Sequence, residues 1–455
     1  MRRQYQVEIL HDISQKVRIP KDFNHKKKLS KLAFGSHSID ILIEYQPSGR
    51  NVISLSKDVA DQLKFPNMNV PLHLFTDNET LFLGPLVGIF TSGFTFFPMR
   101  PIGERSMFFA KLLSVKKSVG ALPFVFGEQH INWEDGTIQG LFYQKDGWEI
   151  YEVPFPNVIY DRLPNRKSER LTEQKKVKER LQIEYLIPWY NPGFFNKLDV
   201  YERLLQNDQI SMYLPETHSF TSFSGIERML AEYGHVYIKP VNGSLGLGIH
   251  QILYNKAEGF YYCRFRDHLG ENKLQKYSSL ESLMSQVFAG KKLNRMLIQQ
   301  GIHLIRTEGR PLDFRIHTNK DDHGNWVVTA IAAKIAGAGS VTTHVNSGGV
   351  IKTISEVFTS MEEQILAESK LEEAALSLSK ALEENIEGII GEIGFDLGLD
   401  RKGNVWLFEA NSKPGRSIFK HPQLKDFDFL TRKLSLSFAV FLAERAITSP
   451  EEVFK

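Results

Sequence analysis

The sequence predicts a multidomain protein of the α/β class that begins with a β-rich region, and three observations support this. The chain has 455 residues, more than one hydrophobic core usually serves, so two to four domains are expected. Its first 85 residues contain short runs in which apolar and polar residues alternate, as in half-buried strands. After them, apolar strand-like runs alternate with stretches of helical spacing, which is typical of α/β architectures.

The composition is ordinary for a soluble globular protein, with 42% hydrophobic and 24% charged residues. A net charge of +3 from 56 basic and 53 acidic residues gives no electrostatic reason to expect nucleic acid as the main partner. Cys263 is the one cysteine, so neither an internal disulfide nor a cysteine zinc site can form. No apolar stretch reaches the roughly 18 residues of a membrane span. We therefore expect a chain made in the cytoplasm, which does not exclude later deposition on a particle or surface.

Residues 1–85 are expected to form a β-rich domain, as a small barrel or sandwich. The runs "SIDILIEY" and "NVPLHLFT" read as strands, and "QPSGRN" and "TDNET" have the composition of turns. The stretch "SLSKDVADQLKF" starts with serine and has helical spacing, which predicts a short helix. This region carries no catalytic motif.

Residues 86–190 are expected to form a small α/β domain with a partly parallel sheet. Strand-like runs are "LVGIFTSG", "LPFVFG" and "NVIYDRL", with a helix predicted at "SMFFAKLLSVKKSVGA" and a hairpin around "KDG". The charge-dense stretch that follows, residues 162–181, favours a solvated linker and helix. An alternative is that Asp161, Arg162 and Arg166 face a ligand at the end of the strand "NVIYD".

Residues 191–455 read as alternating helices and strands. Helices are predicted at "DVYERLLQND", "SSLESLMSQVFAG", "LEEAALSLSKALEENIEGII" and near the end of the chain, and strands at "HVYIKP", "RMLIQQGI", "DFRIHT" and "WVVTAIAAKI". The last two strands are joined by "NKDDHGN", which favours a hairpin.

A lysine followed by a glycine-rich loop, "VYIKPVNGSLGLG", is the first candidate for a binding site. Lys239 ends the strand, and Ser244, Gly246 and Gly248 lie in the loop. This is not a P-loop, where the lysine follows the glycines. Glycines let the backbone approach anionic oxygens closely, but many ordinary surface loops have this composition.

The hairpin "GFDLGLDRKGNVWLFEAN" is the second candidate. A symmetric turn centred between Lys402 and Gly403 would place Asp396 opposite Glu409, with Glu409 and Asn411 on one face of their strand. Two opposed acids should repel each other in a sheet, and a cation removes the repulsion. Carboxylate and amide oxygens suit Mg²⁺. The alternative is a pair of acids that face solvent, but the apolar run "VWLF" indicates a buried strand.

The order of these motifs from about 190 to 420 resembles the ATP-grasp superfamily. "FFNKLDVYERL" resembles the stretch that provides a phosphate-binding lysine, here Lys197, and "VYIKP" resembles the second such stretch, with Lys239. "LIQQGI" resembles the hinge strand, where the backbone near Gln299 and Gln300 would contact the adenine edge. Many ligases of the superfamily have an acidic residue where Gln300 stands.

The rest of the motif set follows the same resemblance. In "GRPLDFRIHT", Asp313 and Arg315 would line the site, and Lys334 would meet the γ-phosphate or an acyl-phosphate. The acid hairpin resembles the metal-binding hairpin, which implies ATP and Mg²⁺ (or Mn²⁺) as cofactors. The loop "THVNSGG" is a candidate substrate loop through Asn346, or an ordinary glycine-containing loop.

The whole chain is similar to a narrower group, the endospore-coat-associated YheC/YheD proteins, through "LGPLVGIFTSG", "VIYDRL" and "NPGFFNKLDVYERL". That resemblance implies an ATP-grasp domain over residues 191–455, with residues 86–190 as the small domain that precedes it. It also implies an association with spore formation.

Two functions follow from the resemblance. One is a ligase that makes an acyl-phosphate from a carboxylate and passes the acyl group to an amine or thiol. Lys197 and Lys239 would then hold phosphates, and Arg315 and Lys334 would stabilise the transferred group. The other is a structural or assembly protein of the spore coat that binds nucleotide without turnover. Substrates could be amino acids, peptides or cell-wall precursors, with coat proteins as further partners.

Overall fold

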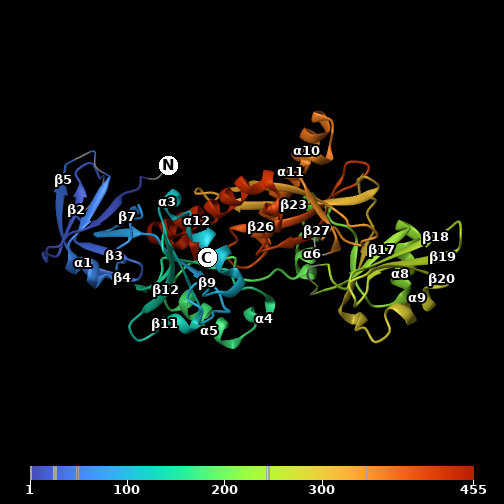
Figure 1. The fold of residues 1–455 in the computed structure, drawn as a ribbon, viewed down its shortest axis with the longest axis horizontal. Helices are drawn as coiled ribbons and strands as arrows, with labels where there is room; N and C mark the ends of the chain where they lie inside the picture. The colour runs from blue at the N-terminus through green and yellow to red at the C-terminus, as the bar shows by residue number, and fades with distance from the viewer. Residues whose placement is uncertain are drawn as a thin grey trace.

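The described residues form five sheets that follow one another along an elongated molecule, as Figure 1 shows for the computed structural model. The structure describes residues 3–23, 28–47, 49, 51–241, 243, 246–344 and 347–454. The N-terminal strands occupy one end, and the strands of residues 217–300 occupy the other. Between them lie the sheet of residues 86–190 and the sheet of residues 306–411.

The N-terminal region forms two four-stranded sheets. In order across the first sheet, the strands are β1 (Gln6–Ile9), β6 (Val52–Leu55), β2 (Lys16–Pro20) and β5 (Leu42–Gln46). In the second sheet they are β4 (His37–Asp40), β3 (Lys31–Phe34), β8 (Thr80–Gly84) and β7 (His73–Asp77). The predicted short helix is α1 (Lys57–Gln62), which begins after Ser56.

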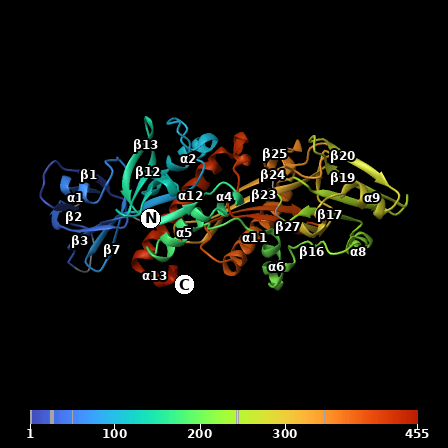
Figure 2. The same cartoon turned by 90° about the horizontal axis from the view of Figure 1, so that it is seen from below.

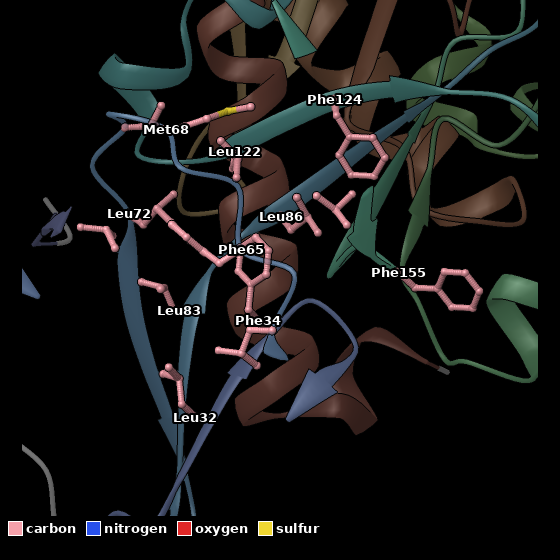
Figure 3. Packing of buried hydrophobic residues seen from close by; sticks show 14 of the residues in the cluster. Leu32, Phe34, Phe65, Met68, Leu72, Leu83, Leu86, Leu122, Phe124 and Phe155 are labelled. Atoms are coloured by element: carbon pink, nitrogen blue, oxygen red, sulfur yellow. The ribbon is translucent and has the colours of Figure 1, made fainter. Parts of the chain in front are cut away.

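One buried hydrophobic cluster joins this region to the next. Figure 3 shows Phe34 and Leu83 of the N-terminal sheets in the same cluster as Leu86, Phe124 and Phe155. All five side chains are almost completely buried. The two regions therefore pack as neighbours, and the domain boundary near residue 85 stays a prediction.

The sheet of residues 86–190 is partly parallel, as the sequence predicted. Its parallel strands are β10 (Leu122–Phe126), β9 (Leu86–Phe90), β14 (Val158–Asp161) and β15 (Trp189–Tyr190). Antiparallel strands extend it, namely β12 (Thr137–Gln144), β11 (Ile131–Asn132) and β13 (Gly147–Pro154). The helices are α2 (Ser106–Leu113), α3 (Lys116–Val119), α4 (Arg166–Glu169) and α5 (Thr172–Ile183), with 3-10 turns at Gly103–Arg105 and Glu128–His130.

An antiparallel sheet forms the far end of the molecule. Its order is β16 (Thr217–Ser219), β21 (Met296–Gln300), β17 (His235–Pro240), β18 (His250–Asn255), β19 (Phe260–Arg266) and β20 (Asn272–Tyr277). Helices α8 (Phe223–Tyr233) and α9 (Leu280–Val287) contribute to its hydrophobic core. The chain enters it through α6 (Lys197–Leu205) and α7 (Asp208–Ser211), and a 3-10 turn at Leu293–Arg295 precedes β21.

A second antiparallel sheet lies next to it. Its order is β25 (Val350–Lys352), β24 (Trp326–Ile335), β23 (Arg310–Lys320), β26 (Glu392–Leu399) and β27 (Val405–Asn411), with β22 (Arg306–Thr307) paired to β23. Helix α10 (Ile354–Val357) leads to α11 (Met361–Asn385). The apolar side chains of α11, which include Leu371, Leu378 and Leu382, are buried in the core of this sheet.

The last long helix, α12 (Lys425–Thr448), packs against three sheets, through β7, through β14, and through β23 and β24. Ser435 accepts a hydrogen bond from Tyr190 on its carbonyl oxygen (2.8 Å), and its Oγ accepts one from Asn319 (3.3 Å). Figure 2 shows the helix between the sheet of residues 86–190 and the sheet of residues 306–411. Two 3-10 turns, Ser417–Lys420 and Pro422–Leu424, precede it and α13 (Pro450–Val453) follows. None of the helices in the described part of the chain is long and apolar enough to cross a membrane.

Candidate functional site

A cavity of about 530 Å³ lies between the β16–β21 sheet and the β22–β27 sheet. The predicted site residues that line it are Lys197, Lys239, Gly246, Gln299, Gln300, Asp313, Arg315, Lys334, Asp396, Glu409 and Asn411. Gly248 is not among the lining residues; its carbonyl oxygen lies 2.9 Å from His250 Nδ1. Ser244 and Asn346 lie outside the described residues. The structure therefore brings nearly all of the described candidates into one cavity.

The acid hairpin has the predicted pairing but not the predicted turn. Asp396 pairs with Glu409, as expected. The turn, however, pairs Leu399 with Val405, which centres it on Lys402 rather than between Lys402 and Gly403. An irregularity in the ladder after Asp396 shifts the register by one residue, and this extra residue restores the pairing of the two acids.

Cations of the chain itself neutralise Asp396. Arg315 donates two hydrogen bonds to its carboxylate (2.8 and 3.0 Å), and Lys334 Nζ donates a third (2.8 Å). Burial alone would raise the pKa of Asp396, but these two cations hold that pKa below its usual range. Arg315 on β23 and Lys334 on β24 therefore relieve part of the repulsion between the two opposed acids.

Asp313 completes this ion-pair group. Lys334 Nζ lies 3.0 Å from its carboxylate, and Thr343 Oγ1 donates a hydrogen bond to it (2.6 Å). Burial raises the pKa of Asp313. Burial lowers the pKa of Lys334, yet the two carboxylates around it raise that pKa above the usual value. Lys334 is thus a charged lysine, held between two acids at the wall of the cavity.

Lys197 lies opposite Glu409. It is the first residue of α6, whose N-terminus is capped by Asn196 through hydrogen bonds from Leu198 N and Asp199 N. Its Nζ is 3.5 Å from Glu409, a looser ion pair than those of Asp396. With respect to the residues that the structure describes, Glu409 therefore keeps most of its hydrogen-bonding capacity for the cavity.

Lys239 is buried, and its hydrogen-bond acceptor is a neutral amide. Its Nζ donates to Gln299 Oε1 (2.8 Å), and Gln299 Nε2 in turn donates to Thr217 Oγ1 (2.9 Å). Burial lowers the pKa of Lys239 to about 7, with Lys197 adding to the decrease and Glu409 opposing it. An anion in the cavity would raise that pKa and be held by the resulting ammonium.

The apolar wall of the cavity was not predicted. Ile249, Ile302, Leu304 and Phe408 line it beside the polar groups. Ile302 and Leu304 lie within four residues of the end of the hinge strand, and Phe408 adjoins Glu409. Their closeness in sequence to the motifs could have indicated that they line the cavity. Arg416, just after the acid hairpin, was also missed and lines the cavity.

The alternative site at the end of β14 is not part of this cavity. Asp161 is buried and accepts hydrogen bonds from Trp189 (3.1 Å) and Lys413 (2.5 Å). Arg162 forms an ion pair with Glu392, and Arg166 donates to a backbone carbonyl oxygen. Asp161 lines a smaller cavity of about 300 Å³ instead, and the charge-dense stretch forms α4 and α5 as the simpler interpretation predicted.

A family model described as YheC/D like ATP-grasp matches residues 186–442. The chain belongs to this YheC/D-like ATP-grasp family. It is 44% identical to the endospore coat-associated protein YheD of Bacillus subtilis (strain 168) over 422 residues, which are 93% of this chain and 92% of that protein. It is 24% identical to the endospore coat-associated protein YheC of the same strain over 271 residues, 59% of this chain and 73% of that protein.

Solved structures show weaker likenesses to this YheC/D-like chain. The VanG D-Ala:D-Ser ligase from Enterococcus faecalis has a TM-score of 0.45 at 13% identity and covers 79% of this chain and 99% of its own. The D-alanine-D-alanine ligase from Coxiella burnetii has a TM-score of 0.44 at 10% identity, and the match covers 81% of this chain and 99% of the ligase. The ATP-grasp ligase PsnB with a minimal precursor has a TM-score of 0.41 at 14% identity, covering 78% and 99%.

Proposed function

We propose that this chain is an ATP-dependent ligase that joins a carboxylate to an amine (or thiol) with release of ADP and phosphate. One observation carries the proposal. Two lysines suited to phosphate and an oxygen-rich acid hairpin line the same cavity. Membership of an ATP-grasp family supports it.

Nucleotide binding uses both walls of the cavity. Lys197 and Lys239 hold the phosphates, and the loop at Gly246 approaches them with its backbone. The adenine lies against the apolar wall. The N–H groups of Gln300 and Gly301 donate to the carbonyl oxygens of Glu216 and His235 (2.8 and 3.0 Å), so the backbone contact with the adenine edge falls to the residues that follow them. Asp313 holds Lys334 in place through their 3.0 Å ion pair.

The donor set fits a hard divalent cation. Asp396, Glu409 and Asn411 offer oxygen ligands from adjacent strands, and neither histidine nor cysteine takes part. Bound Mg²⁺ (or Mn²⁺) would neutralise phosphate charge and polarise the γ-phosphoryl group. Glu409 is the best-placed of the three, since its one ion pair within the described part of the chain is the loose contact with Lys197.

Arg315 and Lys334 stabilise the negative charge of the group being transferred. A substrate carboxylate oxygen attacks the γ-phosphorus, and the bond to the bridging oxygen breaks, so ADP leaves with the electron pair. The amine then attacks the acyl carbon, phosphate leaves with the electrons of the C–O bond, and the nitrogen loses a proton to solvent. Positioning and charge neutralisation do the work, and no side-chain nucleophile is required. The one cysteine is not suited to be a nucleophile, because Cys263 is buried and its burial raises the pKa of its thiol to about 12.

The name of the B. subtilis relative YheD supports a place in the endospore coat. We infer that this chain is made in the cytoplasm and becomes associated with the coat, where coat proteins would be its neighbours.

A second candidate is a coat protein that binds nucleotide without turnover. The observation that favours it is the bidentate contact of Arg315 with Asp396. That contact gives Asp396 a structural role, so an intact acid hairpin does not by itself require catalysis.

Thermal unfolding with and without ATP and Mg²⁺ tests the nucleotide site. Ligand at 100 times its Kd stabilises a protein by about 2.7 kcal/mol, so the native chain should shift by a few degrees. Lys239→Ala and Glu409→Gln should lose the shift, whereas Lys402→Ala, an exposed lysine at the hairpin turn, should keep it. ADP release with a panel of carboxylates and amines then separates the two candidates. A folded chain that shows no shift at millimolar nucleotide would contradict both.

A further inference from the structure

A cluster of arginines lies at the Arg416 end of the cavity, and these arginines outnumber the carboxylates with which they form ion pairs. Arg416 donates to Glu392 (3.1 Å) and to Asp428 (3.4 Å). Arg162 also pairs with Glu392 (3.2 Å), and Arg432 also pairs with Asp428 (3.1 Å). Three arginines therefore share two carboxylates. The Glu392 side chain has no exposed surface, and those of Arg162 and Arg416 are 10% and 9% exposed.

Arg105 adds a fourth positive charge. Its guanidinium donates to two neutral oxygens, Thr91 Oγ1 (2.8 Å) and the Ser92 carbonyl. It has no ion pair with any carboxylate in the described part of the chain. Burial lowers the pKa of Arg105, and repulsion from the nearby Arg162 lowers it further. The cluster thus has an excess of two positive charges, and uncompensated charge in a buried place is costly.

Buried polar atoms without a hydrogen-bond partner among the described residues lie in or next to this arginine cluster. Arg416 Nε is buried and has no hydrogen-bond partner among the described residues, although Arg416 lines the cavity. Both ring nitrogens of the neighbouring His317, which is completely buried and does not line the cavity, are also unpartnered within those residues. Burial, with Arg315 and Arg416 close by, lowers the pKa of His317 well below its usual value, so the ring is neutral. A neutral ring still has one N–H to donate.

We propose that the Arg416 end of the cavity binds a second anionic group of the substrate. The substrate is then an acid with two anions. One is the carboxylate that reacts beside Arg315 and Lys334, and the other is a carboxylate or phosphate held by Arg416. A guanidinium suits either oxyanion because its N–H groups match their geometry. This inference names the substrate class of the proposed ligase and rests on that proposed function.

Two compounds of the same length test the inference. Glutarate has two carboxylates, and glutaramate replaces one of them by a neutral amide. Calorimetry with the full chain, in the presence of ADP and Mg²⁺ to fill the nucleotide part of the cavity, should show glutarate binding about tenfold more tightly or better. A charge-assisted hydrogen bond contributes roughly that much. A third compound, 4-phosphonobutyrate, shows whether carboxylate or phosphate is preferred.

Three variants locate the second anion. Arg416→Gln should remove the preference for glutarate, and it should still fold, because Glu392 keeps Arg162 and Asp428 keeps Arg432. Arg105→Gln, which breaks no ion pair, should reduce the preference by a smaller, severalfold amount. Arg401→Gln removes the same charge at the exposed hairpin turn and should leave the preference unchanged.

The outcomes separate this inference from the proposed function. Equal binding of glutarate and glutaramate, binding of neither, or a preference that survives Arg416→Gln would each overturn the second-anion site. Failure of the ligase proposal would show instead as the absence of a thermal shift with ATP and Mg²⁺. In that case the same titrations without nucleotide still decide whether Arg416 holds an anion.

Discussion

Lys239 shows how one residue can be poised for an anionic ligand. A lysine in water is charged at neutral pH, but burial lowers the pKa of Lys239 to about 7, and its hydrogen-bond acceptor is the neutral amide of Gln299. Polyphosphate beside it would favour the ammonium form and raise the pKa again. Binding and protonation are therefore linked at this residue.

The expected result is proton uptake when ATP binds above pH 7. Below pH 7 Lys239 is already protonated in the free protein. At pH 8 it is mostly neutral, so each binding event should take up close to one proton, and affinity should fall as pH rises above 7. Calorimetry at pH 8 in two buffers with different ionisation enthalpies measures the uptake. Lys239→Arg, which is charged throughout, should bind ATP without it; an undiminished uptake in that variant would assign the proton to another group.

At the scale of elements, the β26–β27 hairpin shows both what the sequence predicts and what it leaves open. The alternation of apolar residues and the polar turn predicted the hairpin and the pairing of Asp396 with Glu409. The position of the irregularity was not predictable, because it depends on packing. A Cβ added at Gly398 would lie 2.5 Å from the ring of Phe408, so this ring packs directly over the glycine.

The residues that pair with Asp396 could not be predicted from the sequence either. Arg315 lies 81 residues before Asp396 in the chain, and the two meet because β23 lies between β24 and β26. Local patterns predict a strand but not its neighbours in the sheet. The motif residues could thus be named from the sequence, whereas the ion pairs and the arginine cluster at Arg416 required the fold.

The two acids of the hairpin should respond differently to neutralisation. Asp396→Asn leaves Arg315 without its anion and Lys334 with Asp313 alone, in buried positions, so the free energy of unfolding should fall by about 3–5 kcal/mol. Glu409→Gln removes a single loose ion pair and should change stability by no more than about 1 kcal/mol. Urea unfolding of both variants measures the difference. Equal losses would mean that Glu409 is as tightly engaged as Asp396.

At the scale of the whole molecule, the sheet of residues 86–190, called the middle sheet below, is joined to the β22–β27 sheet. Buried polar contacts connect the two sheets, and so does α12. Asn191, which follows β15, is completely buried. Its amide nitrogen donates to the carbonyl oxygens of Glu392 (2.8 Å) and Ser412, and its Oδ1 accepts from Gly391 N (2.9 Å). One side chain thus ties the start of β26 to the residue that follows Asn411.

Loss of the Asn191 side chain should weaken both stability and the site. Its backbone is left-handed, with φ at 54°, so Asn191→Gly keeps the conformation and removes only the hydrogen bonds. The backbone groups left unpaired should lower the free energy of unfolding by about 2–4 kcal/mol. The metal-dependent thermal shift with ATP should also shrink, because Asn411 loses the anchor beside it.

Asn207→Gly is the matched control. Asn207 caps the four-residue helix α7, and its side chain accepts one hydrogen bond, from Gln209 N. Replacing a capping asparagine by glycine costs only a few tenths of a kcal/mol, and this residue does not line the cavity. If Asn191→Gly lowers stability and leaves the ATP shift at its native size, the contact between the two sheets supports the fold without positioning the acid hairpin. If both fall together, the middle sheet is part of what holds Asn411 at the site.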